Sequence, residues 1–188
     1  MLIFLSVALV IYGALHFYAF HKVWRAFPQS KTLKWTLVVA GIALSIAPLL
    51  VRILETHDWH RVASVTAWAA YTWMGYLLLF FCVGLVLDIG RGLAKLLKVQ
   101  WRLNGVMTFR IVGIVALAML GYGFFEAQDI RVEKITITTP KLKSGRVTIA
   151  QISDLHLGVM IKDRFLKRVM AKLDELKPDM VVATGDIV

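Results

Sequence analysis

The sequence predicts an α-helical membrane bundle of four transmembrane helices, followed by the start of an α/β domain. Four long apolar runs fill the first part of the chain, at residues 2–20, 33–54, 63–87 and 106–125. At Glu126 the continuous apolar sequence gives way to alternating apolar and polar residues. Hydrophobic residues make up 59% of the chain and charged residues 18%, against about 45–50% and about 25% in soluble domains. These figures exclude an ordinary soluble domain and a disordered chain.

Each apolar run is long enough to cross the hydrocarbon core, which takes about 20 helical residues. Lys34, Arg52 and Arg110 are the charges within these runs, and each lies near a run end. No cation precedes the first run and no small-residue cleavage site follows it, so we expect a retained anchor rather than a cleaved leader. Residues 1–125 are therefore predicted to form a four-helix transmembrane domain of a multi-pass protein in a plasma or inner membrane.

The distribution of lysine and arginine predicts the orientation of these helices, because cytoplasmic connections carry an excess of both. The second connection holds Arg61 alone, whereas the first and third are rich in cations, namely Lys22, Arg25 and Lys31, and Arg91, Lys95, Lys98 and Arg102. We expect the first and third connections to be cytoplasmic. The N-terminus, the second connection and the C-terminal domain are then extracytoplasmic.

The net charge of +10 is concentrated in the apolar part of the chain. Residues 1–125 contain 11 Lys and Arg against 3 Asp and Glu, whereas residues 126–188 contain 11 against 9. Cations beside membrane helices contact anionic lipid, so the lipid bilayer is the expected partner. No basic stripe with interleaved aromatics is present in the polar part, and nucleic-acid binding is not expected. Residues 90–104 fit either a short interfacial helix or a polar loop.

The polar part has the pattern of alternating strands and helices. Residues 132–138 and 146–153 are rich in β-branched residues and predict two strands. Residues 163–177 have apolar residues on one helical face, and Asp163 suits the start of that helix. Residues 179–184 form a short apolar run that predicts a strand buried on both faces. The strands flanking the helix are expected to be parallel, with a right-handed crossover.

Three candidate metal ligands follow two of these strands. Asp154 and His156 come after the strand at 146–153, and Asp186 comes after the strand at 179–184. Ligands bind beyond the carboxyl ends of strands in open α/β sheets, and residues two apart in an extended segment point the same way. Carboxylates with imidazole suit Zn, Fe or Mn. Each motif alone is weak, since Asp154 also fits a helix cap and His156 an ordinary loop residue.

Residues 152–158 (ISDLHLG) and 184–188 (TGDIV) resemble the first two signature blocks of the calcineurin-like metallophosphoesterases. The four spans resemble the membrane-anchored bacterial branch of that family. The resemblance implies a two-sheet sandwich flanked by helices and two divalent metal ions (Mn, Fe or Zn), with Asp154 and His156 binding one ion and Asp186 bridging both. The family's later histidine blocks are absent from the chain. Residues 126–188 are therefore expected to be the N-terminal part of a truncated metallophosphoesterase domain, inactive alone.

The expected function is a membrane-anchored phosphoesterase that hydrolyses a phosphate mono- or diester through a dinuclear metal site. Its membrane location favours a lipid or a nucleotide-linked lipid as the substrate. One alternative is a non-catalytic membrane scaffold or small transporter, in which the polar part is a metal-binding remnant. A further alternative is a sensor bundle that regulates a separate phosphoesterase partner.

Overall fold

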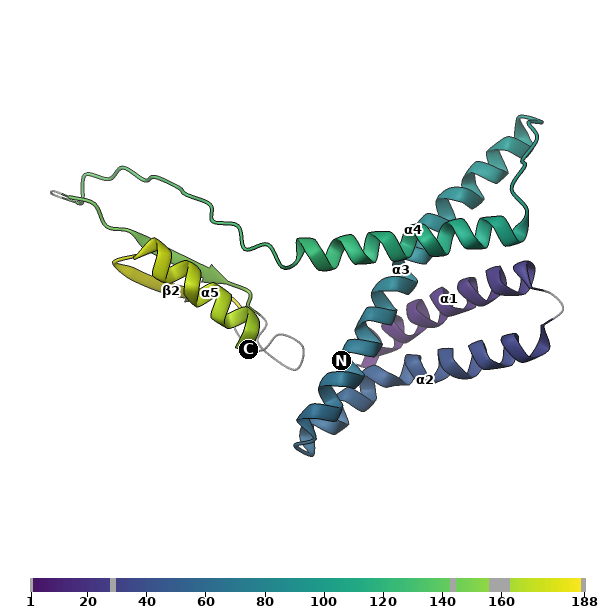
Figure 1. Cartoon of the computed structure of the whole chain (residues 1–188), viewed down its shortest axis with the longest axis horizontal. Coiled ribbons are helices and arrows are strands. Elements are labelled where there is room, and N and C mark those ends of the chain that lie inside the picture. The colour runs from purple at the N-terminus through teal and green to yellow at the C-terminus, as the bar shows by residue number, and fades with distance from the viewer. Residues whose placement is uncertain (1, 28–29, 143–144, 156–162, 187–188) are drawn as a thin grey trace. The chain divides into compact units, whose positions relative to one another are not determined.

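The computed structural model describes residues 2–27, 30–142, 145–155 and 163–186. The chain divides into two compact units, Met1–Phe124 and Phe125–Val188. The first unit is helical, and the second contains a short sheet and one helix (Figure 1).

Four long helices make up the first unit and its junction with the second: α1 (Leu2–Ala26), α2 (Lys31–Thr56), α3 (His60–Leu96) and α4 (Gly105–Glu126). Each predicted apolar run lies within one of them, and all four are long and apolar enough to cross a membrane. The prediction of four long apolar helices in a membrane protein is therefore confirmed. Polar caps mark two helix starts, because Ser30 accepts a hydrogen bond from the Leu33 amide and Asn104 accepts one from the Met107 amide.

Helix α3 continues well past its apolar run. Residues 90–96 form its last two turns, and residues 97–104 connect it to α4 without forming a helix, so a separate interfacial helix over 90–104 is wrong. Leu, Ala and Lys after Gly92 are good helix formers, which lets the helix continue. It ends where Lys98 takes a left-handed conformation, with φ 56°.

The core of the membrane unit lies along one face of α3. Buried Ala63, Ala67 and Ala70 allow close approach of neighbouring helices, and Leu77 and Phe80 continue the same stripe. Helices α1 and α2 pack against α3 and against each other (Figure 1). The core cluster joins Phe80 of α3 to the buried Val112 and Ala116 of α4. Large apolar side chains cover much of the outer surface, as helices in contact with lipid require.

The second unit contains strands β1 (Ile149–Ser153) and β2 (Met180–Thr184), with helix α5 (Asp163–Leu176) between them in sequence. The strands are parallel, with Ile149 opposite Met180 and Ser153 opposite Thr184. This confirms the predicted strand–helix–strand order and the parallel pairing. At the start of the ladder the Thr148 amide donates a hydrogen bond to the Asp179 carboxylate, at 2.7 Å.

Three expectations for this unit are wrong. Residues 132–138 form no strand, and Ile135 and Ile137 are exposed. The strand expected at 146–153 begins only at residue 149. Strand β2 is not buried on both faces, since Met180 and Val181 are about half exposed. A strand needs a hydrogen-bonding partner, and within the described residues the sheet has two strands. These residues form a βαβ unit, and the expected start of a two-sheet sandwich is not confirmed.

Candidate metal site

Asp154 and Asp186 lie at the same edge of the sheet. Asp154 directly follows β1, and Asp186 lies two residues beyond the end of β2. The last residues of the two strands, Ser153 and Thr184, are paired in the ladder. A side-chain hydrogen bond of 3.0 Å from Gln151 Nε2 to Thr184 Oγ1 also joins the middle of β1 to the end of β2. The carboxyl ends of parallel strands thus bring the two aspartates to one edge.

The backbone turns sharply at both strand ends. Asp154 has φ 52° and Gly185 has φ 78°, both in the left-handed region that aspartate tolerates and glycine adopts freely. A Cβ at position 185 would lie 3.0 Å from Asp154 Oδ1 and 3.2 Å from Oδ2. Gly185 therefore leaves room for the Asp154 carboxylate against the turn that carries Asp186. Both carboxylates are solvent-exposed, and carboxylate oxygens are ligands that divalent cations prefer.

The third predicted ligand, His156, lies outside the described residues. Within the residues that the structure describes, no group of three His, Cys, Asp or Glu side chains could hold a metal ion. The structure thus brings two of the three predicted ligand positions to one sheet edge. The predicted role of all three as metal ligands stays a prediction.

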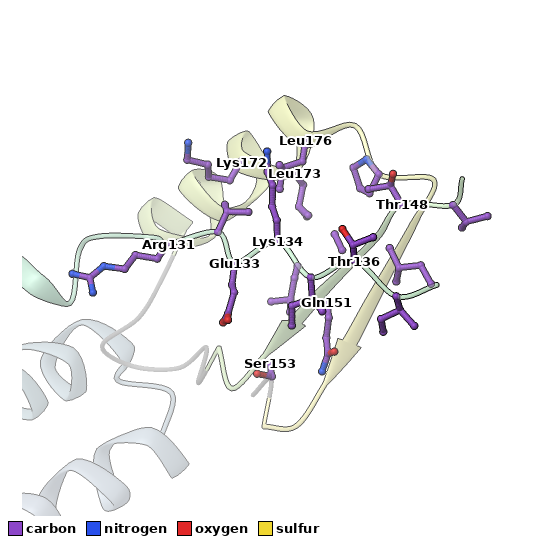
Figure 2. Close-up of a pocket in the computed structure, with 18 of the residues that line it drawn as sticks. Arg131, Glu133, Lys134, Thr136, Thr148, Gln151, Ser153, Lys172, Leu173 and Leu176 are labelled. Atoms are coloured by element: carbon purple, nitrogen blue, oxygen red, sulfur yellow. The ribbon is translucent and has the colours of Figure 1, made fainter. Parts of the chain in front are cut away.

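A pocket of about 1050 Å³ lies in the same unit, between residues 129–139, β1 and α5, and its lining reaches Ser153 and Leu155 on either side of Asp154. Figure 2 shows Glu133 and Lys134 pointing to opposite sides of the extended segment, with Lys172, Leu173 and Leu176 on the neighbouring helix. The Arg168 guanidinium donates a hydrogen bond to the Gln128 carbonyl and so connects α5 to this segment. This pocket was not predicted, because residues 132–138 were expected to be a strand of the sheet.

One carboxyl group on the surface of α5, that of Glu175, has a shifted pKa. Lys172 Nζ lies 2.8 Å from Glu175 Oε2, and this hydrogen bond lowers the pKa of Glu175. Glu175 is therefore ionised and paired at neutral pH, which suits a solvated helix surface rather than an acid or base in catalysis.

A partly buried polar cluster in the membrane unit was missed by sequence reasoning. Asp88 of α3 accepts hydrogen bonds from Tyr18 Oη at 2.6 Å and from Lys22 Nζ at 2.5 Å, both on α1. Lys22 is only 8% exposed. A sequence signal did exist, since Asp88 is the one acidic residue of α3 and Tyr18 and Lys22 are four residues apart on α1. The cluster joins α1 to α3.

Comparison with known proteins supports the resemblance indicated by the two motifs. An uncharacterized metallophosphoesterase of Aquifex aeolicus is 39% identical over 75 residues, which is 39% of this chain and 29% of that protein. The UDP-2,3-diacylglucosamine pyrophosphatase LpxG of Chlamydia trachomatis is 36% identical over 80 residues, or 42% of this chain and 24% of the relative. No family model and no solved structure matches the chain.

A third relative extends the similarity into the helices. It is a transmembrane protein with a metallophosphoesterase domain from Danio rerio, 26% identical over 138 residues, or 71% of this chain and 31% of the relative. That alignment is longer than the whole second unit, so it includes residues of the membrane helices. The chain thus resembles membrane-associated metallophosphoesterases, as the motifs indicated. It spans less than a third of the length of each of these relatives.

Proposed function

We propose that the protein is a membrane-anchored, metal-dependent phosphoesterase that hydrolyses a phosphate mono- or diester. The observation that carries the proposal is the placement of Asp154 and Asp186 at the carboxyl edge of one parallel βαβ unit, with Gly185 leaving space for the Asp154 carboxylate. The names of the relatives support the same class of reaction. Residues 126–188 hold part of the catalytic domain in this proposal, and residues 1–125 anchor it.

In this proposal Asp154 and His156 hold one divalent ion of the Mn, Fe or Zn class, and Asp186 contributes to both ions of a dinuclear site. Such ions supply a nucleophile at neutral pH and stabilise the charge on phosphoryl oxygens. The chain itself supplies anionic oxygen ligands at the strand ends. Gly185 keeps the turn between them free of a side chain.

We propose a lipid-linked phosphoester as the substrate. Four apolar helices hold the catalytic domain at a bilayer surface. One relative is named as a pyrophosphatase of UDP-2,3-diacylglucosamine, a nucleotide-linked diacylated sugar. In this proposal the domain lies on the extracytoplasmic side, which the lysine and arginine distribution supports.

Metal binding tests the site directly. Mn²⁺ binding to the 188-residue chain is measured by calorimetry and by the loss of the free Mn²⁺ electron paramagnetic resonance signal. We expect binding to weaken about 10- to 100-fold in Asp154→Asn and in Asp186→Asn. The exposed Asp174 on α5 provides the control, and Asp174→Asn should bind Mn²⁺ as the wild type does. Equal binding by all four proteins would remove the proposed site.

Hydrolysis is tested with the protein isolated at its native length from its own membrane. Bis(p-nitrophenyl) phosphate serves as the generic substrate and UDP-2,3-diacylglucosamine as the lipid-linked one. We expect turnover that EDTA abolishes and that Asp154→Asn lowers about 100-fold or more. Full activity after both aspartates are replaced would contradict the proposed site, whereas no turnover of either substrate by the unaltered protein would favour the non-catalytic scaffold. The 188-residue chain alone is expected to be inactive.

A further inference from the structure

A pocket of about 580 Å³ lies in the membrane unit, away in sequence from the candidate metal site. It is formed where α1 and α3 end and where residues 97–104 lead into α4. Its lining residues are Arg25, Asp88, Arg91, Gly92, Lys95, Val99 and Trp101. The start of α4 closes against the same region, because a Cβ at Gly105 would lie 3.1 Å from the Arg25 carbonyl oxygen.

The pocket has an excess of positive charge. Asp88 is its one acidic lining residue, and both of its carboxylate oxygens already accept hydrogen bonds, from Tyr18 and from Lys22. Lys22 therefore balances Asp88, and Arg25 is a further cation within electrostatic reach of that carboxylate. Arg25, Arg91 and Lys95 leave a net charge of about +3 around the pocket.

The preference of helix C-terminal ends for cations explains only part of this positive charge. Arg25 and Lys95 lie in the last turns of α1 and α3, where the helix dipole contributes roughly half a negative charge and favours cations. Arg91 lies more than a turn before the end of α3, where the dipole no longer acts. The remaining positive charge is therefore available to an anionic ligand.

The surroundings of the pocket suit the headgroup region of a membrane. The long apolar run of α3 ends at Leu87, directly before Asp88. Beside the cations, Leu93, Leu96 and Val99 are more than half exposed. A ligand with both a phosphate and acyl chains would neutralise the cations and cover these apolar side chains.

Trp101 provides a hydrogen-bond donor at the pocket. Its ring packs beside Gly90, where a Cβ would lie 3.5 Å from the indole. Its Nε1–H is shielded from solvent and has no hydrogen-bond acceptor within the part of the chain that the structure describes. A shielded donor without a partner is costly, and a ligand oxygen in the pocket would supply the acceptor. Tryptophan also prefers the headgroup level of a bilayer.

We propose that this pocket binds the phosphate headgroup of an anionic membrane lipid. Arg25, Arg91 and Lys95 neutralise the phosphate, and the exposed leucines contact the acyl chains. Basic pockets between transmembrane helices are suited to such headgroups. The site is independent of the proposed catalysis, since it needs neither Asp154 nor Asp186. Free inorganic phosphate offers the same anionic group without acyl chains.

Native mass spectrometry of the full 188-residue chain, titrated in detergent with phosphatidylglycerol or phosphatidylcholine, tests the proposal. We expect phosphatidylglycerol to bind about tenfold more tightly than phosphatidylcholine. The double variant Arg91→Gln/Lys95→Gln should lose this preference. Its matched control, Arg52→Gln/Arg61→Gln, removes the same charge near the other connection and should keep the preference within about twofold. Circular dichroism on each variant verifies that the helices are retained.

Three outcomes would overturn the proposal. Equal loss of preference in both double variants would indicate general attraction between a cationic protein and an anionic lipid. No loss in Arg91→Gln/Lys95→Gln would remove these cations from the site. Inorganic phosphate that binds as tightly as phosphatidylglycerol, with the same dependence on Arg91 and Lys95, would identify a soluble phosphate ligand instead of a lipid.

Discussion

His16 shows how one residue can serve a structural purpose within a membrane helix. It is 4% exposed, its Nδ1 lies 2.9 Å from the Tyr12 carbonyl oxygen, and its Nε2 lies 3.0 Å from Trp73 Nε1. An indole N–H can only donate, so Nε2 accepts and the imidazole proton is on Nδ1, which donates to Tyr12. Both ring nitrogens are therefore used within the fold, and His16 joins α1 to α3.

Replacing His16 is expected to destabilise the bundle. His16→Leu removes the acceptor of the Trp73 N–H, and Trp73→Phe removes the donor. Hydrogen bonds between membrane helices contribute about 0.6 kcal/mol on average and at most about 1.7 kcal/mol. The double variant should therefore cost less than the two single variants together by about this amount. Unfolding of the purified chain in detergent measures the four free energies, and additive costs would rule out the coupling.

Gly84 of α3 shows how a single position determines the contact between two helices. A Cβ at this position of α3 would lie 2.5 Å from Tyr18 Oη and 3.0 Å from Tyr18 Cε1. Tyr18 cannot move away without losing its hydrogen bond to Asp88. The absence of a side chain at residue 84 therefore sets how closely α1 approaches α3.

Gly84→Ala is expected to lower the free energy of unfolding by about 1–3 kcal/mol, the usual cost of overpacking. Gly121→Ala on α4 is the matched control, because no atom lies within 4 Å of a Cβ there. The control should be neutral or slightly stabilising, since alanine favours helices over glycine by about 1 kcal/mol. Thermal unfolding of both variants in detergent compares them. Equal transition temperatures would contradict a close contact at Gly84.

Sequence reasoning succeeded best for elements that are specified locally. Each apolar run predicted one helix because length and hydropathy are properties of the run itself, and the amphipathic face at 163–177 predicted α5. The prediction of a strand at 132–138 was wrong because a strand depends on a partner strand, which the sequence pattern does not specify. The predicted burial of β2 was wrong for a similar reason, because burial depends on which other part of the protein covers Val181.

The candidate metal site was predictable in part. The D-x-H and G-D motifs and the parallel strands predict that Asp154 and Asp186 share one edge, and the ladder register agrees. The left-handed turn at Asp154 was not predictable, because aspartate also occupies ordinary conformations in most positions. The pairing of Asp88 with Tyr18 and Lys22 depends on how α1 packs on α3, which no local pattern specifies.

At the scale of the whole molecule, the four apolar helices and the positions of the cations together predict which side of the membrane each connection faces. An even number of spans places the N-terminus and the C-terminal unit on the same side. The third connection carries Lys98 and Arg102, while the second connection, residues 57–59, has no lysine or arginine, and Arg61 lies in the first turn of α3. Cytoplasmic connections carry the excess of cations, so the C-terminal unit is expected outside the cytoplasm.

Cysteine labelling tests this orientation without disturbing the fold. Cys82 is first replaced by serine, and single cysteines are then placed at the exposed positions Thr136→Cys and Gln100→Cys. In intact cells or spheroplasts, a membrane-impermeant maleimide should label Thr136→Cys and leave Gln100→Cys unlabelled, and detergent should make both reactive. The reverse pattern would place the candidate metal site in the cytoplasm. In that case the charges of residues 126–188, and not those of the short connections, would have determined the orientation.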